Sequence, residues 1–277
     1  SVTDTVLVLA EHGADARVLA GGQSLVPMLG MRLVRPSVVV DINGLADELG
    51  RIELRGQELV LGALVRYSEV EHSSVVAEHL PLLQQVVSYI GDRQVRNRGT
   101  VGGAVAQADP TGEMALACMT LGAGVLVHST RGERSIAIED FFLGSYHSAL
   151  EPDELLTAIV FPYAPARCRF FERGRKHNDF ALLSVAAVGS PDDGGAWHDV
   201  RIGLGGVSDT PVLAGAAARE LEGRHWDDAL IARAGELALE AIDPPSDVRA
   251  SADYRRHLTS VHVRRTLADL AGAADHG

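Results

Sequence analysis

Apolar residues recur along the chain in two spacings, one typical of strands and one typical of helices. Short apolar runs predict strands over residues 17–20, 38–41, 59–63, 125–128, 135–138 and 155–161, with the strand at 38–41 expected to be buried. Apolar positions three and four residues apart predict helices over residues 3–12, 81–90 and 114–121. We interpret the polar residues 91–98 as a loop.

The pattern changes at residues 162–167, where Pro162 and Pro165 interrupt it. Beyond this point we predict strands over residues 169–172, 181–188 and 197–203. Three predicted helices close the chain, over residues 211–222, 226–242 and 253–271. Strands followed by helices, rather than strict alternation, indicate an α+β domain. We therefore expect one domain over residues 1–164 and a second over residues 165–277.

The composition excludes several classes of protein. The chain has 277 residues, and 25 Lys and Arg against 37 Asp and Glu give a net charge of −12. This charge disfavours nucleic-acid binding, because phosphate contacts need surplus cations. Only two cysteines are present, Cys118 and Cys168, so a four-cysteine iron–sulfur or zinc site and a disulfide scaffold are excluded.

The location of the protein is indicated only indirectly. No apolar run approaches the ~20 residues of a membrane span, and no signal peptide is evident. The low cysteine content is consistent with a reducing cytoplasm. The first residue is Ser1 rather than Met, which leaves truncation or processing of the N-terminus open.

Two loops with paired glycines are candidates for binding an anionic ligand. The first is Gly21-Gly22-Gln23-Ser24, placed before a short helix that Ser24 is expected to cap, and the second is Thr100-Val101-Gly102-Gly103. Paired glycines allow a ligand to approach the backbone, whose N–H groups can bind anionic oxygen. Two such loops suit the two phosphates of a pyrophosphate, although each one alone is more often an ordinary turn.

Standard nucleotide motifs are absent from the sequence. The run Gly203-Leu204-Gly205-Gly206 breaks the Gly-x-Gly-x-x-Gly spacing, because position 208 is Ser, and no P-loop is present. The 11 histidines include no His-Glu-x-x-His pair, and Ser24 has no evident His–Asp partner. We therefore interpret Ser24 as a phosphate donor or helix cap, and Cys118 as a packed core residue.

Longer motifs around both loops resemble one protein family. They are Ala20-Gly21-Gly22-Gln23-Ser24-Leu25-Val26-Pro27-Met28, and Gln94-Val95-Arg96-Asn97-Arg98-Gly99-Thr100-Val101-Gly102-Gly103-Ala104 leading to Ala108-Asp109-Pro110. Together they resemble the FAD-binding medium subunit of molybdenum hydroxylases, the group that contains carbon monoxide dehydrogenase and xanthine dehydrogenase. The resemblance covers nearly the whole chain. Two long motifs in the same order make it specific.

The resemblance implies a fold and a function. The fold is α+β: a flavin-binding domain of two α/β subdomains, of the PCMH or vanillyl-alcohol-oxidase type and split near residues 50–60, and a C-terminal domain with a three-stranded antiparallel sheet packed on helices. FAD would take electrons from [2Fe–2S] clusters on a small subunit and reduce an external acceptor. Substrate would be oxidised on a large molybdopterin subunit. The expected assembly is a cytoplasmic dimer of heterotrimers.

The resemblance also assigns residues to the FAD site, with no catalytic or metal-binding residue in this chain. The two loops would hold the pyrophosphate, and Glu113 would bind the ribose where the family usually has aspartate. Ile90 and Leu156 would lie near the flavin ring. The nearest match to a basic residue that contacts FAD in relatives is Arg173. The full expected set is Val18, Leu19, Ala20, Gly21, Gly22, Gln23, Ser24, Leu25, Ile90, Thr100, Val101, Gly102, Gly103, Ala104, Asp109, Glu113, Leu156 and Arg173.

Other interpretations remain open at this stage. Arg173 belongs to a basic run from Arg167 to Lys176 that is equally typical of a solvated strand face. The chain could act as a stand-alone flavin oxidoreductase of the same fold, or as an assembly protein that has lost its cofactor. A benzoyl-type reductase subunit with its own four-cysteine cluster is excluded by the two cysteines.

Overall fold

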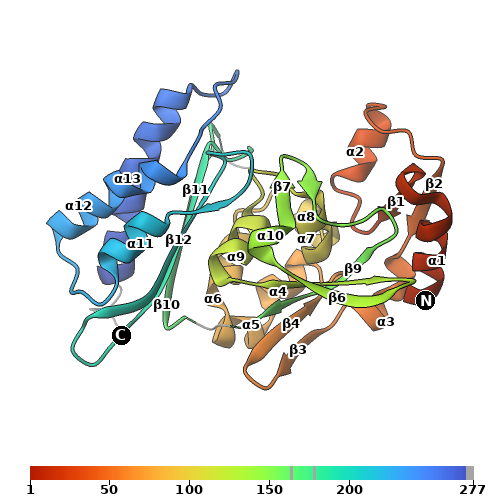
Figure 1. Ribbon diagram of the computed structural model, residues 1–277, viewed down its shortest axis with the longest axis horizontal. Coiled ribbons are helices and arrows are strands. Elements are labelled where there is room, and N and C mark those ends of the chain that lie inside the picture. The colour runs from red at the N-terminus through yellow and green to blue at the C-terminus, as the bar shows by residue number, and fades with distance from the viewer. Residues whose placement is uncertain (163–164, 177–178, 273–277) are drawn as a thin grey trace.

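The computed structural model describes residues 1–162, 165–176 and 179–272. The first of its three parts is a small unit around the parallel pair β1-β2. Its elements are α1 (Val2–His12), η1 (Gly13–Asp15), β1 (Ala16–Leu19), α2 (Leu25–Gly30), β2 (Val38–Asp41), η2 (Asn43–Leu45) and α3 (Ala46–Leu49). In Figure 1 this unit lies at the opposite end of the molecule from the C-terminal helices.

Strand β2 is not buried, contrary to the sequence-based expectation. Its side chains alternate between half-buried and exposed, and Val39 is 42% exposed. The reason is that, within the described part of the chain, β2 pairs only with β1 in a sheet of two strands. A run of three valines predicts a strand, but the number of layers that cover it is decided by distant parts of the chain.

The middle part is an antiparallel five-stranded sheet in the order β3-β4-β9-β5-β6. Its strands are β3 (Ile52–Arg55), β4 (Glu58–Gly62), β5 (Gly124–Ser129), β6 (Gly132–Ala137) and β9 (Leu155–Phe161). The helices of this part are α4 (Tyr67–His72), α5 (Ser74–His79), α6 (Pro81–Val87), α7 (Arg93–Arg98), α8 (Val101–Gln107), α9 (Glu113–Leu121) and α10 (Ile138–Phe141). A hairpin of β7 (Phe142–Gly144) and β8 (His147–Ser148) completes it.

The segment predicted as a polar loop contains helix α7. Asp92 caps this helix, since its carboxylate accepts a hydrogen bond from the Val95 N–H at 2.9 Å. The apolar pattern missed the helix because no residue within it is buried, and Val95 is its only apolar side chain. By contrast, α9 ends at residue 121 as predicted, and Gly122 follows it in the left-handed conformation.

The C-terminal part is an antiparallel sheet in the order β10-β11-β12-β13, covered by helices (Figure 1). Its elements are β10 (Arg167–Arg173), β11 (Leu183–Pro191), β12 (Trp197–Gly205), β13 (Val212–Leu213), α11 (Gly215–Leu221), α12 (Asp228–Leu237), η3 (Ala238–Ala241) and α13 (Ala252–Gly272). Within the described residues the sheet has four strands, not three. The additional strand β13 takes up the start of the region predicted as a helix over 211–222.

The two faces of this C-terminal sheet pack against different partners. Val185 and Ala187 on β11 belong to the core formed with α11, α12 and α13, whereas Ala186 and Val188 belong to the core of the middle part. Helix α9 contacts β11 and β12, and α6 contacts β10. The sheet is therefore buried on both faces. The predicted boundary between residues 164 and 165 adjoins residues 163–164, which lie outside the described residues.

Candidate functional site

The first glycine loop presents unpaired backbone donors. Among the residues that the structure describes, the N–H groups of Gly21, Gly22, Gln23 and Ser24 donate no hydrogen bond. Gly22 has φ of 74°, a left-handed conformation that favours glycine. Ser24 occupies the N-cap position of α2 but its hydroxyl makes no capping bond, so the predicted cap is wrong. The exposed Ser24 hydroxyl and the unpaired N–H groups of the loop are therefore the candidate donors to a ligand.

The second loop is built differently, because its backbone donors are already used. The N–H of Val101 donates to the Val65 carbonyl, and that of Gly102 donates to the Ala63 carbonyl, each at 3.0 Å. The N–H of Gly103 donates to the Thr100 hydroxyl at 3.2 Å, which caps helix α8. These bonds fix the N-terminus of α8 in place. The helix can therefore attract an anion to its exposed surface through the helix dipole, but not through free N–H groups.

The two glycines of this second loop have separate roles. Gly102 is buried, and a Cβ there would lie 2.6 Å from the Ala63 Cβ and 2.8 Å from the Ala63 carbonyl oxygen. Gly103 is exposed, and a Cβ there would meet only the Thr100 hydroxyl at 2.6 Å and two atoms at 4.0 Å. Gly102 thus allows packing within the protein, whereas Gly103 keeps the surface open to a ligand.

Stability measurements should separate these two roles. We expect Gly102→Val to cost about 1–3 kcal/mol of unfolding free energy, because the new side chain overlaps backbone that cannot move aside. This lowers the melting temperature of the ligand-free chain by roughly 2–12 °C. Gly103→Ala serves as the comparison, since it loses at most the cap, about 1 kcal/mol. A Gly102→Val chain that melts like the wild type would contradict the packing role.

The two loops meet directly. A Cβ on Gly21 would overlap the Arg98 carbonyl oxygen and lie 2.9 Å from the Gly99 Cα, so only glycine permits this approach. The Arg98 carbonyl and Gly99 immediately precede the second loop. The unpaired donors of the first loop therefore lie beside the capped N-terminus of α8, an arrangement that suits a pyrophosphate.

Arg66 and Asn43 tie the loops together, and the sequence motifs did not reveal them. The Arg66 guanidinium donates to the Arg98 carbonyl and to the Asn43 side-chain oxygen, the second at 2.6 Å. The Asn43 amide in turn donates to the Ala20 carbonyl at 2.9 Å. Partial burial, together with the charge of Arg98, lowers the pKa of Arg66 from its usual value. In the sequence, Asn43-Gly44 reads as a turn, and nothing local links it to Arg66.

Asp109 lies on the turn between α8 and α9, and Glu113 begins α9. The Asp109 carboxylate accepts bonds from the Thr111 N–H at 2.9 Å and the Thr111 hydroxyl at 2.7 Å, so it shapes the turn. The Tyr146 hydroxyl approaches the same carboxylate at 3.4 Å. Glu113 is the first residue of α9, and burial, with a smaller contribution from the Asp109 charge, raises its pKa to about 7. Its carboxyl group is therefore partly protonated near neutral pH.

The remaining residues of the expected set occupy three kinds of position. Ile90 and Leu156 are buried in the middle core, at 7% and 5% exposure, so only a small part of each side chain could contact a ligand. Val18, Leu19, Ala20, Leu25 and Ala104 are half-buried around the loops. Arg173 is exposed at the end of β10, on the strand face that carries Phe171, which stacks on His262 of α13. The structure does not bring Arg173 together with Glu113.

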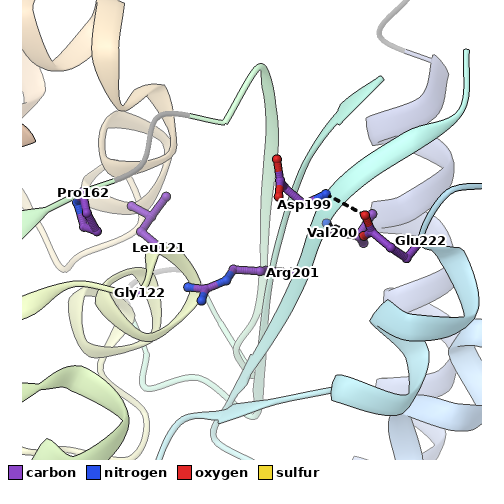
Figure 2. A pocket seen from close by; sticks show the side chains of 7 residues that line it. All are labelled: Leu121, Gly122, Pro162, Asp199, Val200, Arg201 and Glu222. Carbon is purple, nitrogen blue, oxygen red and sulfur yellow. Dashed lines mark hydrogen bonds between the residues drawn. The ribbon is translucent and has the colours of Figure 1, made fainter. Parts of the chain in front are cut away.

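A cavity of about 350 Å³ lies elsewhere, between α9 and β12 (Figure 2). It is lined by Leu121, Gly122, Pro162, Asp199, Val200, Arg201 and Glu222. The Glu222 carboxylate accepts bonds from the Asp199 and Val200 N–H groups, each at 3.0 Å. The lining carries two carboxylates and one arginine, which makes this a poor site for a pyrophosphate, and no residue of the expected set lines it.

The described residues hold neither a metal-binding cluster nor a membrane-crossing helix. No group of three His, Cys, Asp or Glu side chains is placed to hold a metal ion. No helix combines the length and the apolar character that crossing a membrane requires. Cys118 is fully buried, and burial raises the pKa of its thiol, as expected of a core residue.

Comparison with known proteins identifies the family. Residues 1–164 match the model of the FAD binding domain in molybdopterin dehydrogenase, and residues 169–270 match the CO dehydrogenase flavoprotein C-terminal domain. The carbon monoxide dehydrogenase medium chain of Afipia carboxidovorans is 36% identical over 269 residues, covering 96% of this chain and 93% of the relative. The nicotine 6-hydroxylase medium subunit of Paenarthrobacter nicotinovorans is 36% identical over 259 residues, covering 94% and 90%.

Solved structures agree with the sequence comparison. Quinoline 2-oxidoreductase from Pseudomonas putida 86 matches with a TM-score of 0.94 and 37% identity, covering 99% of this chain and 95% of that one. The chain thus carries an FAD-binding domain followed by a CO dehydrogenase-type C-terminal domain. It belongs to the family of FAD-binding medium subunits of molybdenum hydroxylases. This confirms the resemblance and the α+β fold predicted from the sequence.

Proposed function

We propose that this chain is the electron-output subunit of a three-part molybdenum hydroxylase. In this proposal it receives electrons from [2Fe–2S] clusters on a small subunit, and substrate is oxidised on a large molybdopterin subunit. The complex is a cytoplasmic dimer of heterotrimers. The observation that carries the proposal is the set of unpaired N–H groups at Gly21–Ser24, beside the exposed Gly103 surface. Membership of the family supports the remainder.

Different residues of this chain are assigned to different parts of FAD. We assign the pyrophosphate to the N–H groups of the first loop and the Ser24 hydroxyl, opposite the N-terminus of α8. The two halves of the site are held in register by Arg66 and Asn43. Glu113 is assigned to the ribose, and Ile90 and Leu156 to the apolar floor beneath the flavin ring. Arg173 lies on the face of β10 opposite to Cys168 and Phe170 of the middle core, which weakens its assignment to FAD.

Bound FAD would supply the chemistry, accepting electrons one at a time from a cluster and releasing them in pairs or singly to an acceptor. The protein contributes position and electrostatics. The loop donors and the α8 dipole offset the charge of the pyrophosphate. Residues 1–164 and 165–277 act as the two domains of this subunit, with the sheet of the second packed on α9 of the first.

The test has two parts, binding and association. The purified full-length chain is expected to bind FAD non-covalently in a fluorescence titration. Tagged and expressed with the genes beside its own, it is expected to co-purify with an iron–sulfur and a molybdenum-containing subunit. A chain that binds no FAD would refute the cofactor site. A chain that binds FAD, purifies alone and reduces acceptors by itself would instead support the stand-alone oxidoreductase.

A further inference from the structure

The glycine run at residues 203–206, which lacks the dinucleotide spacing, lies where the C-terminal sheet packs on the middle part. Gly203 and Gly205 are the glycines at the end of strand β12, which contacts α9. A Cβ on Gly203 would overlap the Thr120 hydroxyl and lie 2.8 Å from Leu116 Cδ1. A Cβ on Gly205 would lie 3.3 Å from Leu116 Cδ2. The end of β12 therefore approaches α9 closely because these two residues lack side chains.

Gly206 continues this contact with a hydrogen bond to the FAD-binding domain. Its φ of 75° is a left-handed conformation that favours glycine. In this conformation its N–H donates to the Pro110 carbonyl at 2.9 Å. Pro110 lies on the turn between α8 and α9, one residue after Asp109 and three before Glu113. The end of β12 therefore holds the turn that leads to the proposed ribose-binding residue.

Arg255, on α13, fixes Gly206 from within the C-terminal part. Its buried guanidinium donates to the Gly206 carbonyl at 2.9 Å and to the Leu182 carbonyl at 2.7 Å. It also donates to the Asp247 carboxylate at 3.0 Å, which places an opposite charge beside the buried cation. Because hydrogen bonds from a charged donor are strong, Arg255 holds Gly206 in the orientation that directs its N–H to Pro110.

The α8–α9 turn also accepts a backbone bond from its own domain. The Tyr146 N–H, on the turn of the β7–β8 hairpin, donates to the Ala108 carbonyl at 2.8 Å. The hairpin thus holds the start of the turn, next to the end of α8. The bond from Gly206 is the one nearer in sequence to Glu113, so the C-terminal part acts on the end of the turn that begins α9.

We propose that Arg255 and Gly206 are positioning residues for FAD, which act from the C-terminal part through the Gly206–Pro110 hydrogen bond. This inference rests on the proposed function, in which Glu113 binds the ribose. Neither positioning residue is assigned a contact with the cofactor. They set the position of the α8–α9 turn, and the turn sets the position of Glu113. Occupation of the FAD site and docking of the C-terminal part on α9 then favour each other.

The main experiment is a fluorescence titration of FAD into the full chain, after circular dichroism has shown that each variant is folded. We expect Arg255→Met to weaken FAD binding by roughly 3- to 30-fold, because Gly206 is no longer held and the turn can shift. Arg256→Met is the matched control, since Arg256 is the next residue on α13 and donates to the Leu239 and Ile242 carbonyls of the C-terminal part. The control should bind FAD like the wild type. Wild-type affinity in a folded Arg255→Met chain would overturn the proposal.

A double variant separates positioning from a general loosening of the fold. In a Glu113→Ala chain the proposed ribose contact is already lost, so adding Arg255→Met should weaken FAD binding little further. A role in stability alone would instead give the full loss in either background. Additive losses would therefore show that Arg255 does not act through Glu113, and the proposal would fail.

Hydrogen exchange in the wild-type chain tests the same link without a variant. Because linkage is reciprocal, FAD binding should slow the exchange of the Gly206 N–H. The Ala214 N–H, which donates to the Ile202 carbonyl at 2.8 Å within the C-terminal part, is the internal control and should exchange at the same rate with and without FAD. Unchanged exchange at Gly206 would contradict the proposal even if Arg255→Met does not fold. A wild-type chain that binds no FAD would instead refute the cofactor site on which the inference rests, so the two failures are distinguishable.

Discussion

Gly21→Val is expected to weaken FAD binding by roughly 30- to 1,000-fold. A side chain at this position would overlap the Arg98 carbonyl and Gly99, so the two glycine loops must separate. Separation moves the unpaired N–H groups of the first loop away from α8. Losing one or two hydrogen bonds to a charged phosphate costs about 2–4 kcal/mol, which corresponds to that range of dissociation constants.

The measurement is a fluorescence titration of FAD into the purified variant, after circular dichroism has shown that its secondary structure is retained. Gly144→Val provides the matched control, because a Cβ at Gly144 meets nothing within 4 Å and the residue lies on strand β7. The control should bind FAD like the wild type. Wild-type affinity in a folded Gly21→Val chain would show that the close approach of the loops is not needed for the cofactor.

The parts of the site that the sequence predicted are those encoded by local chemistry. Paired glycines beside a hydroxyl mark a backbone that a ligand can approach, whatever the rest of the fold. The roles within the pairs were not predictable, because they depend on distant residues. Gly102 faces Ala63, and its N–H is used by the Ala63 carbonyl, a partner 39 positions away in the chain. Gly103, its neighbour, is exposed.

The same distinction explains the elements that were misjudged. The run of valines predicts the conformation of strand β2, and the capping residue marks the start of helix α7. The burial of both elements depends instead on which parts of the chain pack against them. On β10 the run Arg167, Arg169 and Arg173 suggested a cationic contact with the cofactor. The period of two along a strand, applied from the core residue Phe170, would have shown that Glu172 rather than Arg173 lies on the face toward the middle core.

Arg66→Ala is expected to weaken FAD binding by roughly 10- to 100-fold, although we do not assign Arg66 a contact with the cofactor. Its guanidinium bridges the Arg98 carbonyl and Asn43, and Asn43 holds the Ala20 carbonyl of the first loop. Hydrogen bonds from a charged donor contribute about 1.5–3 kcal/mol, so their loss lets the two loops move apart. The expected change in affinity follows from that range.

Two companion variants separate bridging from charge. Arg66→Lys keeps the positive charge but replaces the planar fork, which can bridge two acceptors, with a single ammonium group. If bridging matters, Arg66→Lys should bind FAD nearly as weakly as Arg66→Ala, and the losses in Arg66→Ala and Asn43→Ala should not add in the double variant. Near-normal binding by Arg66→Lys would mean that Arg66 acts through its charge on the phosphates. Additive losses would mean that the two residues act independently, and that the loops are held in register by some other contact.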